Sequence, residues 1–170
     1  MREDLTRKMR VFAASLMLGA CGFRLAGSDP LPTILAHPYL SLKDPYTDFS
    51  RVFEHRLKVA GAALQSNSEG ASATIEVTRD QVDQRTLAVT GSTPTQPANI
   101  PTLYELTYTV TYRVRGPDKE LIAPQTISLA RSYSYNPNLQ LAKEREADVL
   151  RKQMAEDLVA VLMHRLTSLK

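Results

Sequence analysis

Leu103-Tyr104-Glu105-Leu106-Thr107-Tyr108-Thr109-Val110-Thr111-Tyr112-Arg113-Val114-Arg115 is the stretch that decides the fold of this chain. From Tyr104 onward, apolar and polar side chains alternate without a break, and this period of two residues is that of a β-strand. One face of the strand carries tyrosine, leucine and valine, and the other carries threonine, glutamate and arginine. Such a strand buries one face under other elements and leaves the opposite face polar.

Further strands are expected before and after this segment. Ala73–Arg79 also alternates, and this strand is expected to continue through a bulge to Val89. The turn Gly116-Pro117-Asp118 leads into another strand, Leu121–Tyr135. The three strands follow one another closely, so we expect them to be antiparallel neighbours.

Two segments that contain proline flank these strands. The apolar stretch Ile34–Leu42 is a strand candidate, in which Pro38 favours either a position at a sheet edge or a late start near Tyr39. Thr90–Thr102 contains three prolines and no charged residue, which predicts an exposed loop. Exposed loops on a rigid scaffold are common contact sites, and the alternative is a hairpin tip without a function.

Two amphipathic helices complete the predicted elements. Thr47–Leu64 has apolar residues at steps of three and four, and Gly61 marks its end. Its N-cap is expected to be one of three polar residues, Thr47, Asp48 or Ser50. Asn136, a capping residue followed by proline, starts the longer helix Pro137–Ser168. The apolar stripe expected along this helix consists of Ala147, Leu150, Met154, Leu158, Val161, Leu162, Leu166 and Leu169.

The predicted order is strand, helix, three strands, helix. If both helices cover one face of the sheet, the fold is α+β, a two-layer α/β sandwich. The chain has 170 residues, of which 43% are hydrophobic and 23% charged, as expected of one globular domain. Residues 1–20 contribute four basic and two acidic side chains, so the net charge of +3 leaves +1 for the remainder. A global positive field for nucleic acid is therefore not expected.

Residues 1–20 have the pattern of a secretory signal peptide. The basic segment Met1–Arg10 precedes the run Val11–Ala20, whose one polar residue is Ser15. This run is too short to cross a bilayer, which needs roughly 20 apolar residues, but it fits the apolar region of a signal peptide. We therefore expect residues 21–170 to form a single mature domain.

The run ends in Leu18-Gly19-Ala20-Cys21, which resembles the bacterial lipobox and contains the one cysteine of the sequence. The resemblance implies cleavage before Cys21, a diacylglycerol on its sulfur and an acylated amino group, and several acyl chains make an anchor effectively permanent. Gly22 stands where aspartate is the usual signal for retention in the inner membrane, so the outer membrane is favoured. The alternative is an ordinary signal peptide that ends in a chance cysteine.

The sequence contains no motif for catalysis or metal binding. His37, His55 and His164 are far apart, and no HExxH, CxxC, GxSxG, Walker or GxGxxG pattern occurs. Ser132 and Ser134 have no base near them in the sequence. We therefore expect no enzyme activity, no cofactor and no metal, while noting that folding can assemble distant residues into a site.

Six basic residues beside the apolar strands remain as candidates for binding an anion: Arg79, Arg85, Arg113, Arg115, Arg131 and Lys143. Arg131 is unusual because it shares the parity of Ile127, Leu129 and Tyr133, which places it at a sheet margin or beside an acidic partner. Cations that converge would bind an anion through charge-assisted hydrogen bonds. Cations that do not converge are surface charges of little energetic value.

Three segments resemble the LPS-assembly lipoprotein LptE family. Cys21-Gly22-Phe23-Arg24-Leu25-Ala26-Gly27 is similar to the family's mature start, which often reads Cys-Gly-Phe-x-Leu-Arg-Gly. Arg131-Ser132-Tyr133-Ser134-Tyr135-Asn136-Pro137, followed by Leu141-Ala142-Lys143-Glu144, resembles its last strand and the start of its last helix, and Tyr104-Glu105-Leu106 resembles its third strand. Ala26 replaces the frequent arginine, and the Thr90–Thr102 loop is longer and richer in proline than in many relatives.

The resemblance implies two helices packed on a four-stranded mixed, largely antiparallel sheet, in a lipoprotein on the periplasmic side of the outer membrane. It also implies a non-catalytic protein that plugs the LptD β-barrel and helps to place lipopolysaccharide in the outer leaflet. Because lipopolysaccharide carries phosphates, the candidate contacts are Lys143, Arg131 and Arg85. Two alternatives stay open: an envelope lipoprotein with enzymatic or inhibitory activity on a periplasmic polymer, and a structural subunit of another outer-membrane machine.

Overall fold

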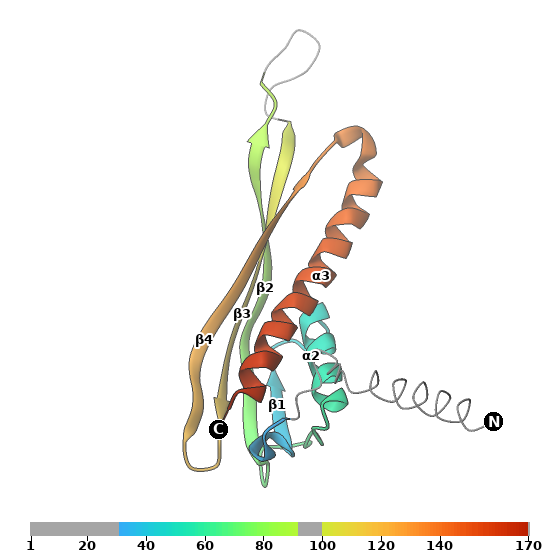
Figure 1. Cartoon of the computed structure of the whole chain (residues 1–170). Coiled ribbons are helices and arrows are strands. Elements are labelled where there is room, and N and C mark those ends of the chain that lie inside the picture. The colour runs from blue at the N-terminus through green and yellow to red at the C-terminus, as the bar shows by residue number, and fades with distance from the viewer. Residues whose placement is uncertain (1–30, 92–99, 170) are drawn as a thin grey trace, which may run out of the picture.

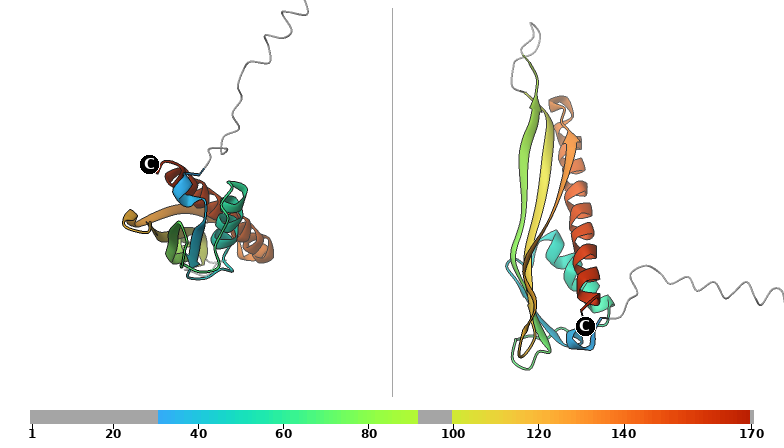
Figure 2. Two further views of the ribbon diagram at one scale, coloured as in Figure 1. Left: turned by 90° about the horizontal axis from the view of Figure 1, so that it is seen from below. Right: turned by 60° about the vertical axis from the view of Figure 1, so that its left-hand side comes forward.

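A computed structural model describes residues 31–91 and 100–169 of the chain (Figure 1). The elements follow in the order η2 (Thr33–Leu35), β1 (Pro38–Leu42), α2 (Asp48–Val59), β2 (Ala73–Val89), β3 (Pro101–Arg115), β4 (Glu120–Ser134), η3 (Pro137–Leu139) and α3 (Gln140–Thr167). Both helices lie on the same side of one sheet (Figures 1 and 2), so the predicted two-layer α+β fold is confirmed. The predicted signal peptide, Cys21 and the central residues 92–99 of the predicted loop lie outside the described residues.

The sheet is mixed and largely antiparallel, as the family resemblance implied. Its strand order is β1-β2-β3-β4, with β1 parallel to β2 and the two other pairs antiparallel. A parallel pair needs a crossover connection, and α2 supplies it. β1 is an edge strand, as predicted, and it starts at Pro38, where a missing N–H does least harm to the ladder.

Helix α2 begins at a specific cap and ends at a glycine. Thr47 is the N-cap, because its hydroxyl accepts a hydrogen bond from the Ser50 backbone N–H at 3.0 Å. The predicted end at Leu64 is wrong, since the helix stops at Val59. Gly61 follows with a left-handed backbone, φ +93°, which a side chain would disfavour.

Strands β2 and β3 form a long hairpin that extends well beyond α2 (Figure 1). The pairing shifts register between Val77 and Arg79, which confirms the predicted bulge. At the far end, the Thr90 N–H donates to the Ile100 carbonyl at 2.8 Å. β3 then starts at Pro101, so the strand includes the last residues of the predicted loop.

Helix α3 returns along the sheet from the far end of β4 to the end that holds α2 and β1 (Figures 1 and 2). Asn136 caps the turn before it, as predicted, by accepting a hydrogen bond from the Asn138 N–H at 3.0 Å. Pro137–Leu139 form a 3₁₀ turn, so the α-helix itself begins at Gln140, later than predicted. The long helix thus covers the sheet over most of its length.

The core lies between the sheet and the two helices. Side chains without exposed surface come from every layer: Phe49, Phe53 and Leu57 of α2, Ile75 of β2, Leu106, Val110, Tyr112 and Val114 of β3, and Met154, Leu162 and Leu166 of α3. Burying one such side chain contributes roughly 1.5–3 kcal/mol. The face of β3 that was predicted to be apolar is therefore the face that packs against the helices.

The apolar stripe predicted along α3 is confirmed at most positions and wrong at one. Ala147, Met154, Leu158, Leu162 and Leu166 are buried. Val161 is 45% exposed, although its spacing predicted a core residue. It lines a groove between α3 and the edge strand β4, so at this position the helix does not pack closely on the sheet.

Candidate functional site

Helix α3 and the edge strand β4 face each other along a strip that holds two of the three predicted anion contacts. We call this strip the α3–β4 seam; it runs from Ser134 and Lys143 at the far end to Gln125 and Arg165 near the end of α3. Strand β4 positions its residues by the period of two, and α3 positions its own by steps of three and four. The seam is open to solvent because β4 has no further strand beside it.

Lys143 is held at the far end of the seam. Its Nζ donates to Glu146 Oε2 at 2.7 Å and to Ser134 Oγ at 3.2 Å. Its side chain is 17% exposed, so the ammonium lies partly inside the protein while Glu146 faces the solvent. The bond to Ser134 joins the first turn of α3 to the last residue of β4.

A cluster of three tyrosines lies on the adjoining strand ends. The ring of Tyr104 lies 5.7 Å from that of Tyr133 and 5.2 Å from that of Tyr135, between centroids. Burial raises the pKa of the Tyr133 hydroxyl, and the neighbouring Tyr104 adds to this shift. The cluster gives the far end of the seam a rigid aromatic surface, which is suited to packing and hydrogen bonding.

Arg131 lies both at the sheet margin and beside an acidic partner, the two alternatives that its position in the strand pattern predicted. It lies on the edge strand β4, on the face toward the helices, and its Nη2 donates to Asp157 Oδ2 of α3 at 2.5 Å. The two side chains are 38% and 52% exposed. An ion pair this exposed contributes about 0–1 kcal/mol, so another anion can replace the carboxylate at small cost.

Arg85 does not join the other two cations. It pairs with Glu105 across the β2–β3 ladder, and its Nε donates to Glu105 Oε1 at 2.6 Å. Glu105 has the opposite parity to the buried Leu106, so this pair lies on the face of the sheet away from the helices. The structure therefore brings Lys143 and Arg131 to the same seam and leaves Arg85 on the other face.

The outer face of the sheet is rich in hydroxyl groups. Thr109 and Ser128 lie 3.3 Å apart, and Thr111 and Thr126 lie 2.9 Å apart, between side-chain oxygens. Nearer the end of the hairpin that holds α2, Glu76 accepts hydrogen bonds from both Arg113 and Arg115. Alternation in the sequence predicted a polar face, but the partner of each hydroxyl depends on the strand register.

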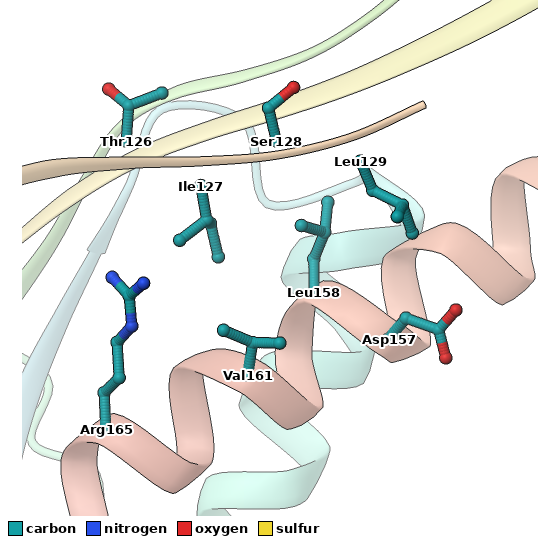
Figure 3. A pocket seen from close by; sticks show the side chains of 8 residues that line it. All are labelled: Thr126, Ile127, Ser128, Leu129, Asp157, Leu158, Val161 and Arg165. Atoms are coloured by element: carbon teal, nitrogen blue, oxygen red, sulfur yellow. The ribbon is translucent and has the colours of Figure 1, made fainter. Parts of the chain in front are cut away.

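A groove of about 370 Å³ lies within the α3–β4 seam (Figure 3). Four residues of β4 and four of α3 line it: Thr126, Ile127, Ser128 and Leu129, and Asp157, Leu158, Val161 and Arg165. Ile127, Leu158 and Val161 point into the space between strand and helix, and the Arg165 guanidinium stands at one end (Figure 3). The centre of the groove is apolar and its ends are charged.

Arg165 was missed by the sequence analysis. Its Nη1 donates to the Tyr112 hydroxyl at 3.0 Å and to Gln125 Oε1 at 2.7 Å. Within residues 31–91 and 100–169, no carboxylate forms an ion pair with it. Its place seven residues after Leu158 puts it on the same helix face, and this was the signal available in the sequence.

The described residues contain neither a cluster for a metal ion nor a membrane-spanning helix. Across 31–91 and 100–169, no group of three or more histidine, cysteine or acidic residues could hold a metal ion. Within the same residues, no helix is long and apolar enough to cross a membrane. Ser134 accepts its hydrogen bond from Lys143, and Ser132 pairs with Glu105 in the strand register. Cations, tyrosines and an apolar groove are thus what the seam offers to a ligand.

Solved structures of bacterial lipoproteins share this fold. A lipoprotein B of Nitrosomonas europaea superposes with a TM-score of 0.68 at 23% identity, covering 86% of this chain and 91% of its own. The rare lipoprotein B of Shewanella oneidensis gives a TM-score of 0.64 at 26% identity, covering 78% of this chain and 94% of its own. The two-layer α+β fold of this chain is thus one that is found in bacterial lipoproteins.

The family model described as LptE, lipopolysaccharide-assembly, matches residues 39–166, and the chain belongs to this family. The LPS-assembly lipoprotein LptE of Yersinia pestis (strain Pestoides F) is 28% identical over 159 residues, which cover 90% of this chain and 71% of the relative. The protein of the same name from Yersinia pseudotuberculosis (strain YPIII) matches to the same extent. The family predicted from three short segments is therefore confirmed over most of the chain.

Proposed function

We propose that this protein is a lipoprotein of the outer membrane, anchored through acyl chains on Cys21 and facing the periplasm. In this proposal it forms a complex with the LptD β-barrel and binds lipopolysaccharide during assembly of the outer leaflet. The observation that carries the proposal is the family match over residues 39–166, which includes the whole α3–β4 seam. The function is binding and assembly, without catalysis.

The outer face of the sheet supports a place inside a β-barrel. The interior of such a barrel is polar and hydrated, and a plug needs a surface that forms hydrogen bonds there. Thr109, Thr111, Thr126 and Ser128 supply paired hydroxyls in the middle of this face. An uncharged hydroxyl can replace a hydrogen bond to water by one to the inner surface of the barrel with little change in free energy. Such groups therefore suit the surface of a domain that lies inside a barrel.

The seam supports contact with the phosphates of lipopolysaccharide. Lys143 and Arg131 are each paired with an exposed carboxylate, Glu146 and Asp157. A phosphate can displace such a carboxylate because it offers more acceptor oxygens and carries more negative charge, while the exposed ion pair that it replaces is weak. Arg85, on the other face, is a separate candidate. The binding should weaken as salt concentration rises, because exposed charges are screened.

Charge reversal tests the proposed contacts. The variants Lys143→Glu and Arg131→Glu are expected to bind lipopolysaccharide at least about tenfold more weakly, a loss of about 1.4 kcal/mol each. Arg51→Glu is the matched control, because Arg51 also pairs with a nearby carboxylate, Asp48, but lies on α2 away from the seam. Arg85→Glu is measured separately. Unchanged affinity in both seam variants would remove these residues from the proposal.

Photocrosslinking in cells tests the barrel partner. Probes at Gly91, Ile100 and Lys143 are expected to give adducts with a heat-modifiable outer-membrane β-barrel, and the Lys143 probe is also expected to capture lipopolysaccharide. A probe at Val59, which is exposed on α2, measures the background. If no position yields a barrel adduct, the proposal that the protein forms a complex with LptD is wrong. An activity on a periplasmic polymer, or a role in another outer-membrane machine, is then the better hypothesis.

Metabolic labelling tests the anchor. Cells given radiolabelled palmitate are expected to label the wild-type protein and not the Cys21→Ala variant, because the thioether-linked lipid needs that sulfur. The variant should also leave the membrane fraction, since the acyl chains supply the anchoring free energy, about 0.8 kcal/mol per buried methylene. Label that persists in Cys21→Ala would exclude this attachment site.

A further inference from the structure

We propose that the groove in the α3–β4 seam binds one acyl chain of an anionic lipid, with the charged head group at Arg165. The groove is lined by Ile127, Leu129, Leu158 and Val161 in its middle and by Arg165 at one end. We assign the chain to lipopolysaccharide, and this assignment of the source rests on the proposed function. The groove itself and its ligand class follow from the structure of the seam alone.

Val161 is exposed where the helix pattern predicts burial. The periodicity of α3 predicts a core residue at this position, and the neighbouring stripe residues Leu158 and Leu162 are indeed buried. Val161 is 45% exposed because it faces the groove and not a packed strand. An apolar side chain that the fold leaves uncovered inside a groove, with polar residues at its rim, is typical of a ligand site.

One end of the groove carries the positive charge of Arg165. Arg165 is half-buried, and the two groups that accept its hydrogen bonds, the hydroxyl of Tyr112 and the amide oxygen of Gln125, are neutral. A guanidinium has five N–H donors, so these two bonds from Nη1 leave donors for another group. Among the described residues, Arg131 and Lys143 are each paired with a carboxylate, whereas Arg165 is not. This arrangement is complementary to an anionic head group.

The opposite end of the groove fixes the direction of the ligand. Asp157 lines that end and points out of it (Figure 3), and its carboxylate pairs with Arg131. An anionic head placed there would have to displace the Asp157 carboxylate from Arg131, whereas at Arg165 no carboxylate of residues 31–91 and 100–169 competes with it. The chain should therefore run from Arg165 past Val161 and Ile127 toward Leu129.

The size of the groove favours one chain. Its volume of about 370 Å³ is at the lower end of the range for small-molecule sites, roughly 300–1,000 Å³. A single hydrocarbon chain fits such a space, whereas the body of a lipid with several chains must stay outside it. Each methylene that enters should raise the affinity about fourfold, until the groove is full.

Calorimetric titration with dodecyl phosphate, below its micelle concentration, tests the site. Wild-type protein is expected to bind one equivalent, and affinity is expected to rise from the octyl to the dodecyl compound. Val161→Trp fills the groove and should weaken binding at least about tenfold. Val149→Trp is the matched control, because Val149 is an exposed valine on the same helix and does not line the groove. Equal binding by both tryptophan variants would overturn the proposal.

Arg165→Gln tests the head group. It should weaken binding of dodecyl phosphate about tenfold, the usual value of a hydrogen bond to a charged group, and leave binding of neutral dodecanol unchanged. Retained dodecanol binding also shows that the variant is folded. If the variant loses affinity for both ligands by the same factor, Arg165 does not select an anionic head group, and that part of the proposal is wrong.

Competition with lipopolysaccharide tests the source of the chain. Lipopolysaccharide is expected to displace dodecyl phosphate from the wild-type protein and to bind Val161→Trp more weakly than Val149→Trp. The Lys143→Glu variant distinguishes the proposed function from the proposed groove site. It should bind lipopolysaccharide more weakly and bind dodecyl phosphate with unchanged affinity. If lipopolysaccharide binds without displacing the probe, the assignment of the chain to lipopolysaccharide is wrong while the proposed function stands. If lipopolysaccharide does not bind at all, the proposed function is wrong. The titration with dodecyl phosphate then still shows whether the groove binds an acyl chain with an anionic head group.

Discussion

The carboxylate of Asp80 accepts a hydrogen bond from the hydroxyl of Thr47, and this contact joins strand β2 to the N-cap of helix α2. The same carboxylate oxygen lies 3.4 Å from the Ser50 hydroxyl. Thr47 also accepts the Ser50 backbone N–H, so one small network caps the helix and fixes it to the sheet. Asp80 follows the register shift between Val77 and Arg79, which places its side chain on the helix side of the sheet.

Removing the Asp80 carboxylate should destabilise the protein. Asp80→Ala is expected to lower the free energy of unfolding by about 1–3 kcal/mol, because the Thr47 hydroxyl loses its charged acceptor in a partly buried place. Urea unfolding followed by circular dichroism measures this change. Asp83→Ala is the control, because Asp83 is exposed on β2 and its side chain accepts a hydrogen bond from the exposed Gln81 side chain. This variant should change stability by less than about 0.5 kcal/mol.

Alkaline pH should destabilise the protein through Tyr108. Burial raises the pKa of the Tyr108 hydroxyl, and the charge of Asp80 raises it further. In the unfolded chain a tyrosine ionises near pH 10. The stabilisation is therefore fully present below about pH 10 and is lost as the pH rises toward the folded pKa, with a slope of up to about 1.4 kcal/mol per pH unit.

Urea titrations at several pH values between 8 and 11 measure this slope. Tyr108→Phe is expected to reduce the slope of the free energy of unfolding against pH above pH 10. Burial also raises the pKa of Tyr133, so part of the slope should remain in this variant. A Tyr108→Phe protein with the wild-type slope would show that Tyr108 is not the group responsible.

The aromatic side chains of α2 should carry much of its packing free energy. Phe53 is fully buried, and its ring lies 5.6 Å from that of Phe49. Phe53→Ala is expected to lower the free energy of unfolding by about 3–5 kcal/mol, since it removes apolar contacts and leaves a cavity. Val59→Ala, at a position 70% exposed on the same helix, should have little effect in the same denaturation assay. Similar losses in the two variants would contradict the position assigned to α2.

The ion pair between Arg131 and Asp157 should contribute little to stability. A double-mutant cycle with Arg131→Gln and Asp157→Asn is expected to give a coupling free energy below about 1 kcal/mol, because both side chains are exposed to water. Thermal unfolding of the four proteins gives the value. A coupling above about 2 kcal/mol would mean that the pair is structural, and that Arg131 is not readily available to a ligand.

Local sequence patterns predicted the elements better than they predicted the site. Alternation over Leu103–Arg115 placed β3 and its buried face, and the proline after Asn136 placed the start of the last helical segment. Two boundaries were wrong: α2 stops at Val59, before the predicted end marker Gly61, and does not reach Leu64, and a 3₁₀ turn delays the start of α3 to Gln140. Of the candidate anion contacts, Lys143 and Arg131 share the seam, whereas Arg85 is on the opposite face.

The sequence alone determined which faces of the strands and helices are apolar, because periodicity is a property of neighbouring residues and needs no knowledge of the fold. The tertiary structure alone decided how α3 lies over β4, and with it the exposure of Val161. It also brought Arg165 to Tyr112 and Gln125, which lie 53 and 40 positions away in the chain. Contacts over such distances depend on strand register and helix crossing, which no local pattern contains. The groove and its cation are therefore products of the packing between two elements, each of which was predictable by itself.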